Sequence, residues 1–296
     1  MKYILFIAIL VTLIACSDTK ENGKPLFLAS SYPVYAILSE IAGDAVEVDY
    51  IVPTGASPHT YLPKPSDVKA ASRATALFYI AQNFDGWITG VPSKVKIKLI
   101  DMVPMDNIIY FSCGHDHSVE GEVHEHEHEV DPHFWFDPMT VKAMLKELTE
   151  SMIKLYPSAE VTFRKNAEAF SASLTQIDTE MQEILSPLEG KSMFLHHPSF
   201  NYLIERYGLE YSGAIEESPG KEPSPKFISK LVNDIKISGT KAIFSEPQLN
   251  GKNVKVIAHE AGVQVFELNP EGNAENMKTY KDILIKNANI IRKALE

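Results

Sequence analysis

A long helical pattern in the middle of the chain constrains the fold more than any other feature. No Gly or Pro occurs from Ala159 to Ser186. Within this range apolar side chains recur at steps of three and four residues, at Phe163, Ala167, Phe170, Leu174, Ile177, Met181 and Leu185. At 1.5 Å per residue the pattern makes a helix of about 40 Å, and a helix without Pro or Gly has no low-cost way to bend. We therefore predict a rigid linker helix over residues 158–186.

Segments that favour β-strands alternate with helical patterns on both sides of this helix. The expected strands cover residues 26–29, 46–52, 76–81 and 95–100 in the first half, and residues 192–195, 210–215, 241–245 and 263–268 in the second. Strands that alternate with helices are typical of βαβ units and a parallel sheet. We predict an α/β fold of two (β/α)4 lobes with parallel sheets, residues 26–157 and 187–296, joined by the linker helix.

Local signals mark the ends of two further helices. Ser224 is expected as an N-cap, with Pro225 at the first helical position and Gly239 just past the last turn. The buried side of this helix should consist of Phe227, Ile228, Leu231, Val232 and Ile235. Asp137 and Pro138 open the other helix, which carries an apolar face as well. That face is formed by Val141, Met144, Leu145, Leu148 and Met152.

The N-terminus has the pattern of an export signal. Lys2 is followed by an apolar run from Tyr3 to Ile14, which is too short to span a bilayer. The four residues that end at Cys16 resemble the bacterial lipobox, which implies cleavage before Cys16 and lipidation of its thiol. We predict a signal peptide over residues 1–15, a tether over residues 16–25, and a position in the cell envelope outside the cytoplasm. An ordinary secretory signal with an incidental Cys is the alternative.

Cysteine content and net charge restrict the partners. If Cys16 is lipidated, Cys113 is the only thiol left, so no intramolecular disulfide forms. The formal net charge of −11 disfavours nucleic acid and anionic lipid surfaces, and it suits the capture of cations. We therefore expect membrane contact through the lipid anchor only.

Residues 113–129 form a segment rich in histidine and carboxylate. It contains no Lys or Arg, and its histidines are His115, His117, His124, His126 and His128. Imidazole suits Zn, Cu and Ni, so the segment is predicted to bind metal in auxiliary, exchangeable sites. A solvated acidic linker is the alternative. His124, Glu125 and His128 match the H-E-x-x-H pattern of zinc peptidases, but no helix face exists here to hold them, which argues against a peptidase.

Three histidines outside this segment occur where an α/β protein collects its ligands. His59 lies in a turn-rich segment after the second strand, His133 precedes a capped helix, and His197 follows the first strand of the second half. Ligands of open α/β sheets bind beyond the carboxyl ends of the strands, so all three fall at a cleft between two lobes. Three histidines and one further position suit tetrahedral Zn²⁺. A single His is more often a capping or core residue, so each alone is weak support.

The sequences around these histidines resemble the zinc- and manganese-type solute-binding proteins of bacterial ABC transporters. The matching segments are 58–67, 131–138, 197–209, 222–226 and 245–248. The match runs in order over essentially the whole mature chain and looks most like the zinc branch, whose members often carry a His-rich acidic loop at this place. The resemblance implies two lobes bridged by one long helix, with His59, His133 and His197 as metal ligands. The manganese branch usually has Glu where His197 stands, which again points to Zn²⁺.

Other polar residues have roles that the resemblance leaves open. The family often has Asp at the position of Asn269, so Asn269 is expected to be a weak fourth ligand or to orient a metal-bound water. Glu222 and Glu246 are candidates for acceptors that fix the histidine tautomers; capping and surface charge are the alternatives. His196 is expected to be a strand-end residue, and His259 is expected at the surface.

The expected function is that of a monomeric, lipid-anchored receptor that captures Zn²⁺ and delivers it to the membrane permease of an ABC transporter. No phosphate loop of the G-x-x-x-x-G-K type occurs, so a separate ATPase must drive transport, and no reaction is expected of the chain itself. A receptor for manganese or another divalent metal, or a metal-binding adhesin of the same family, is the alternative. A zinc hydrolase is a further alternative, with Glu222 or Glu246 as the general base.

Overall fold

The computed structural model describes residues 23–111 and 129–296. The predicted signal peptide, Cys16, Cys113 and the histidines of the 113–129 segment lie outside these ranges. Among the described residues, no helix has both the length and the apolar character that a membrane span requires.

The first half of the chain forms one parallel sheet with helices beside it. Its strands are β1 (Leu26–Ala29), β2 (Glu47–Tyr50), β3 (Ala76–Tyr79) and β4 (Lys96–Lys98), and its helices are α1 (Tyr32–Ala42), α2 (Pro65–Arg73) and α3 (Gln82–Asp85). The strand order is β2-β1-β3-β4, and every neighbouring pair is parallel. The predicted strands are thus confirmed, with ends that differ by at most two residues.

The second half also alternates strands with helices, but its four strands form two separate hydrogen-bonded pairs. Its strands are β5 (Ser192–Leu195), β6 (Glu210–Ala214), β7 (Ala242–Ser245) and β8 (Gln264–Glu267), and its shorter helices are α6 (Asn201–Tyr207), α7 (Pro225–Ser238) and α8 (Lys252–Ala261). Two parallel pairs form, β5 with β6 and β7 with β8, and β5 lies against β7. Just past β7, the backbone N–H of Glu246 donates to His196 Nδ1 at 3.2 Å, so a side chain joins the two pairs at this edge.

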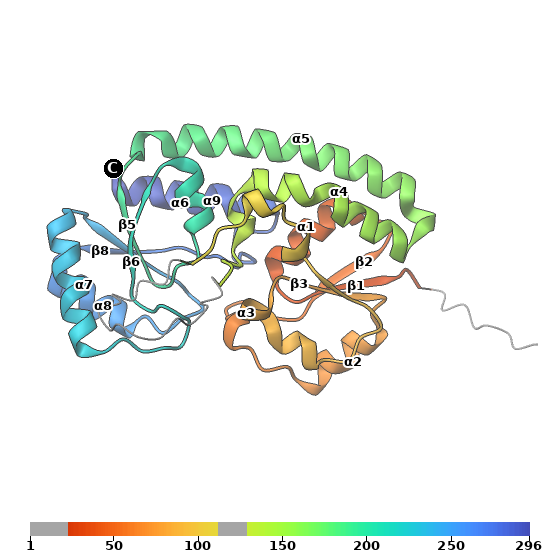
Figure 1. Cartoon of the computed structure of the whole chain (residues 1–296), viewed down its shortest axis with the longest axis horizontal. Helices are drawn as coiled ribbons and strands as arrows, with labels where there is room; N and C mark the ends of the chain where they lie inside the picture. The colour runs from red at the N-terminus through yellow and green to blue at the C-terminus, as the bar shows by residue number, and fades with distance from the viewer. Residues whose placement is uncertain (1–22, 112–128) are drawn as a thin grey trace, which may run out of the picture.

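Three long helices lie together along one side of the molecule. They are α4 (Pro138–Leu155), α5 (Glu160–Leu185) and α9 (Tyr280–Leu295). Figure 1 shows α5 running along the top of the molecule over both halves, and α5 contacts α1 and α4 as well as α9. The predicted caps are confirmed, because Asp137 accepts from Met139 N and Ser224 accepts from Phe227 N. Gly239, at φ +68°, ends α7 as expected.

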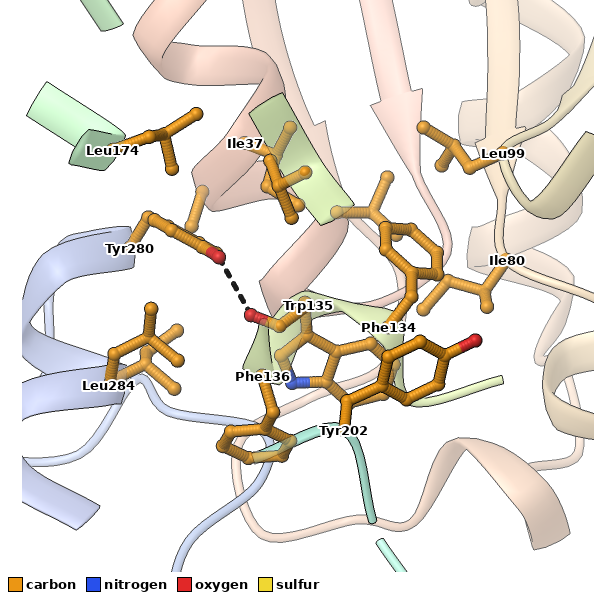
Figure 2. Close-up of a cluster of buried hydrophobic side chains, with 14 of the residues drawn as sticks. Ile37, Ile80, Leu99, Phe134, Trp135, Phe136, Leu174, Tyr202, Tyr280 and Leu284 are labelled. Atoms are coloured by element: carbon orange, nitrogen blue, oxygen red, sulfur yellow. Dashed lines mark hydrogen bonds between the residues drawn. The ribbon is translucent and has the colours of Figure 1, made fainter. Parts of the chain in front are cut away.

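One apolar core runs through both halves behind the strand ends. It contains Phe27 of β1, Leu195 of β5, the buried face of α5 and the fully buried Trp135. Figure 2 shows Tyr280 of α9 donating to the Trp135 carbonyl, a hydrogen bond of 2.7 Å. The indole Nε1 of Trp135 donates in turn to Pro270 O at 3.1 Å. The halves therefore share packing, and their division at residues 157 and 187 stays a prediction.

Candidate metal centre

Three short irregular segments bring His59, His133 and His197 together. His59 is the middle residue of the 3₁₀ turn Pro58–Thr60, and its ring packs edge-on against Phe84 with 4.6 Å between ring centroids. His133 is the N-cap of the 3₁₀ turn Phe134–Phe136, and His197 follows the end of β5. These positions lie beyond the carboxyl ends of the parallel strands, where open α/β folds place ligands.

The three imidazoles meet through their Nε2 atoms. His133 Nε2 lies 3.3 Å from His59 Nε2 and 3.3 Å from His197 Nε2. The three candidate ligand atoms all lie within 4.8 Å of one another. Two nitrogens bound to one tetrahedral Zn²⁺ at 2.0 to 2.1 Å are about 3.3 to 3.4 Å apart, so the two Nε2···Nε2 distances match the spacing that zinc requires.

Two of the rings have a partner at Nδ1, which leaves Nε2 free for a metal. His133 Nδ1 donates to Asp131 Oδ1 at 2.7 Å, and His197 Nδ1 lies 2.6 Å from Glu246 Oε1. The ring of His59 has a backbone hydrogen bond to Asn83. The carboxylates are held in turn: Asn201 Nδ2 donates to Asp131 Oδ2, and Ser199 Oγ donates to Glu246 Oε1. Such outer partners fix ring orientation and tautomer in metal sites.

Burial sets the protonation of the site. It holds the pKa values of His59 and His133 well below the ordinary value, and the nearby ring of His197 lowers both pKa values further. Neutral imidazole is the form that binds a metal. Burial also raises the pKa of Asp131 to about 7 and that of Asp85 to about 6. A buried carboxyl such as that of Asp131 gains a counter-charge when a cation binds near it.

Asn269 shapes the turn after β8. Its Oδ1 accepts from Gln248 Nε2 at 2.6 Å and from the backbone N–H groups of Glu271 and Gly272 at 3.1 Å each, and its Nδ2 donates to Gly272 O. Both Oδ1 and Nδ2 of Asn269 therefore already have hydrogen-bond partners within the turn. Asn287 completes the support through two hydrogen bonds with the Asn269 backbone.

The turn carries a buried carboxyl that sequence reasoning missed. The side chain of Glu271 has no hydrogen bond or ion pair among those found in residues 23–111 and 129–296, and the residue is 7% exposed. Burial raises its pKa well above the ordinary value, as do the neighbouring carboxylates of Glu246 and Asp85. Glu246, one of the two carboxylates that raise the pKa of Glu271, also contacts His197. The sequence does show a Glu two positions after Asn269 and next to Gly272, which marks a turn. The direction of the Glu271 side chain, however, depends on the tertiary fold.

The remaining candidates take different places. Glu246 is buried and contacts His197, whereas Glu222 is exposed ahead of α7. His259 is exposed on α8, and His196 is buried at the end of β5, outside the group of three histidines that meet. The histidines at positions 115, 117, 124, 126 and 128 lie outside the described residues.

A family model described as zinc-uptake complex component A, periplasmic (ZnuA), matches residues 28–294. The chain belongs to the ZnuA family. The zinc-binding lipoprotein AdcA of Streptococcus pneumoniae (strain ATCC BAA-255 / R6) is 30% identical over 297 residues, which cover 96% of this chain and 58% of AdcA. This ZnuA-family chain therefore spans little more than half the length of its AdcA relatives.

Two further ZnuA proteins match along nearly their whole length. The high-affinity zinc uptake system protein ZnuA of Bacillus subtilis (strain 168) is 26% identical over 314 residues, covering 95% of this chain and 93% of that protein. A crystal structure of ZnuA has a TM-score of 0.76 at 27% identity, covering 92% of this chain and 99% of the other. The two-lobed α/β fold of the ZnuA family is thus present here.

Proposed function

We propose that the protein is a receptor that captures Zn²⁺ outside the cytoplasm and hands it to a membrane permease. The observation that carries the proposal is the meeting of three imidazoles, with His133 Nε2 at 3.3 Å from both His59 Nε2 and His197 Nε2. A carboxylate beside Nδ1 of His133 and of His197 leaves Nε2 of these rings free. The geometry suits the tetrahedral nitrogen site that Zn²⁺ prefers. Membership of a zinc-uptake family supports the same cargo.

His59, His133 and His197 are the proposed ligands, and we assign the fourth position to Glu271 rather than to Asn269. The Glu271 carboxyl is buried and its pKa is raised by Glu246, which contacts His197, whereas the Asn269 amide is bonded within its own turn. A buried carboxyl gains a counter-charge when Zn²⁺ arrives, so ionisation of Glu271 and metal binding favour each other. Glu246 and Asp131 hold the rings from outside.

A hydrolase is less well supported by this geometry. Such an enzyme needs a general base within reach of a metal-bound water. Glu246 contacts Nδ1 of His197, on the opposite side of the ring from Nε2, and it also accepts from Ser199. Glu222 is exposed. Neither of the two candidate bases is arranged for that role, which favours a binding protein.

The partners and the location follow from the same proposal. The family is a component of a zinc-uptake complex, so the partners are the permease and a separate ATPase of an ABC transporter. The protein acts as a monomer, attached to the cell envelope through a lipid on Cys16, and the name of the AdcA relative, a zinc-binding lipoprotein, agrees with this anchor. The histidines of the 113–129 segment supply weaker, exchangeable zinc sites.

Single substitutions test the central site. His59→Ala, His133→Ala and His197→Ala should each abolish tight Zn²⁺ binding in a competition titration with a chelator, because a zinc site with two nitrogens lacks a ligand. Circular dichroism should show that the variants stay folded. His259→Ala, on the exposed face of α8, is the matched control and should bind as the wild type does. Unchanged tight binding in all three cluster variants would exclude the proposed site.

A further inference from the structure

His196 is a buried histidine that the proposed zinc site does not use. It follows β5 directly and is fully buried, although its neighbour His197 is in the metal cluster. His196 Nδ1 accepts from the backbone N–H of Glu246 at 3.2 Å. Since a backbone N–H can only donate, the ring proton of neutral His196 must be on Nε2. The ring therefore has one accepting and one donating edge, each turned toward a different segment.

The accepting edge of His196 supports the residue that orients His197. Glu246 follows β7, and its Oε1 lies 2.6 Å from His197 Nδ1. The two histidines, adjacent in the chain, thus contact the same glutamate, one through its carboxylate and the other through its backbone. No strand of β7–β8 is paired by backbone hydrogen bonds with β5–β6 among the described residues. The His196 ring holds the Glu246 backbone at this edge, while Ser199 and His197 contact the Glu246 carboxylate.

The donating edge of His196 faces a second buried carboxylate. Nε2 lies 3.6 Å from Glu216 Oε1, and Glu216 is 3% exposed. Glu216 N donates to His196 O at 2.8 Å, and Glu216 Oε2 accepts from Gly220 N at 2.9 Å. These contacts keep the ring from turning, because rotation would leave the Glu246 N–H unpaired and place a nitrogen lone pair toward a carboxylate.

The turn bonded to Glu216 reaches the other half of the molecule. A Cβ at Gly220 would lie 3.6 Å from the Thr60 side chain, in the same 3₁₀ turn as His59. The segment 216–220 therefore approaches one proposed ligand while His196 connects it to the support of another. A change at the His196 ring should therefore alter the positions of the proposed zinc ligands.

We propose that His196 is a positioning residue for zinc: it holds the Glu246 backbone, and through Glu246 it sets the place of His197 Nε2. The inference rests on the proposed zinc site. The hydrogen bond that His196 Nδ1 accepts from Glu246 is the contact that affects the metal site. Glu216, on the other side of the ring, keeps Nδ1 turned toward Glu246. Removing the acceptor leaves the Glu246 N–H buried without a partner, so the Glu246 backbone and the carboxylate beside His197 shift.

Two near-isosteric substitutions separate the two edges of the ring. Asn places an acceptor where Nδ1 is, so His196→Asn keeps the bond to the Glu246 N–H and loses the contact with Glu216. Gln reaches as far as Nε2, so His196→Gln keeps the Glu216 side and loses the bond to Glu246. His196→Leu removes both and keeps an apolar volume. His259→Leu, on the exposed face of α8, is the control for a His-to-Leu change.

The measurements are Zn²⁺ affinity by chelator competition, the visible absorption spectrum of the Co²⁺-loaded protein, and the melting temperature without metal. Co²⁺ absorption reports ligand geometry, which a purely structural role of His196 would not change. We expect His196→Leu and His196→Gln to bind Zn²⁺ about tenfold more weakly, at the lower end of the effect of outer partners, with an altered Co²⁺ spectrum. His196→Asn should keep the wild-type affinity and spectrum.

Other outcomes would overturn the inference. Wild-type affinity and Co²⁺ spectra in both His196→Gln and His196→Leu, at any melting temperature, would make His196 a core residue only. Binding by His196→Asn as weak as that of His196→Gln would show that the Glu246 link is not the route. Should His196→Leu not fold, the comparison of Asn with Gln decides alone. Failure of the wild type itself to bind Zn²⁺ would instead refute the proposed function.

Discussion

At the scale of single residues, the site depends on which ring nitrogen carries a proton. Asp131 receives two hydrogen bonds from His133, one from the backbone N–H at 2.9 Å and one from Nδ1 at 2.7 Å. The ring proton is thereby kept on Nδ1, and Nε2 faces the other histidines. A second proton on the His133–Asp131 pair adds positive charge beside the metal position. It therefore disfavours Zn²⁺ binding, whether it is held by His133 or by Asp131.

The protonation of Asp131 leads to a prediction about pH. Its pKa is raised to about 7 by burial, so below pH 7 the metal-free protein holds a proton there that Zn²⁺ must displace. The contribution of this proton to Zn²⁺ affinity should therefore rise with pH up to about 7, by at most about tenfold per pH unit, and level off above it. Glu271, whose pKa is also raised, adds its own dependence in the same direction. Calorimetric titrations in buffers of different ionisation enthalpy should show net proton release at pH 6 and less at pH 8.

The variant Asp131→Asn identifies the source of that proton. Its Zn²⁺ affinity should be lower at pH 8, because the charged partner of His133 is gone, by about 10- to 100-fold. Its proton release at pH 6 should be smaller than that of the wild type because the Asp131 proton is gone, but not zero, since Glu271 remains to titrate. Equal proton release by the two proteins would mean that Asp131 is already ionised in the metal-free site.

At the scale of elements, the turn after β8 depends on Gly272. Its φ is +71°, and a Cβ at this position would lie 2.6 Å from Ile283 Cγ1 of α9. Gly190 has the same φ of +71° but no atom within 4 Å of its Cβ position. The two glycines therefore share the same backbone strain on substitution and differ in the space around them.

Gly272→Ala and Gly190→Ala form a matched pair. Gly190→Ala should cost about 1 kcal/mol of unfolding free energy from backbone strain, and Zn²⁺ affinity should not change. Gly272→Ala should cost about 2 to 3 kcal/mol, because overpacking against Ile283 adds to the strain. It should also weaken Zn²⁺ binding by moving Glu271. Denaturant unfolding and chelator competition measure the two effects; equal Zn²⁺ affinities in both variants would remove Glu271 from the site.

The long helix α5 is the second element with a testable role. Ala172 is an exposed residue near its middle, so substitution there changes the helix backbone and little else. Ala172→Gly should lower the unfolding free energy by about 1 kcal/mol and Ala172→Pro by about 3 kcal/mol or more. Only the Pro variant should weaken Zn²⁺ binding, because a kink changes the spacing of the halves. Tight binding by a stably folded Pro variant would show that α5 does not set that spacing.

At the scale of the whole molecule, the two halves are connected by more than one helix. The central apolar core includes residues of both, and Trp135 bonds to Tyr280 and to Pro270. Asn273 of the second half also donates to Tyr50 and Thr54 of the first, at 2.6 Å each. Large rotation of one half against the other would break buried packing as well as these bonds.

Zinc capture should therefore proceed without closure of the lobes. Small-angle X-ray scattering should give the same radius of gyration with and without Zn²⁺, because only the loops around the histidines need to move. A measurable compaction on addition of Zn²⁺ would indicate a hinge and contradict the rigid arrangement. His133→Ala, measured with Zn²⁺ in the same way, controls for metal bound elsewhere on the chain.

Local patterns in the sequence are enough to predict the elements and the three histidines. The periodicity of residues 159–186, the N-caps Asp137 and Ser224, and the alternation of strands and helices are all read from neighbouring residues. His59, His133 and His197 are predicted to meet because strand ends of parallel sheets gather at one edge. The structure confirms these elements and places the three rings together.

Only the tertiary structure decided which polar side chains face the cluster. Asn269 and Glu271 are two residues apart, and the folded turn uses the amide of the first for its own backbone and buries the carboxyl of the second. Glu222 and Glu246 looked equivalent in sequence, yet only Glu246 lies behind His197. The direction of a side chain in an irregular turn depends on residues far away in the chain, such as Asn287 and Ile283 here, and local periodicity carries no information about them.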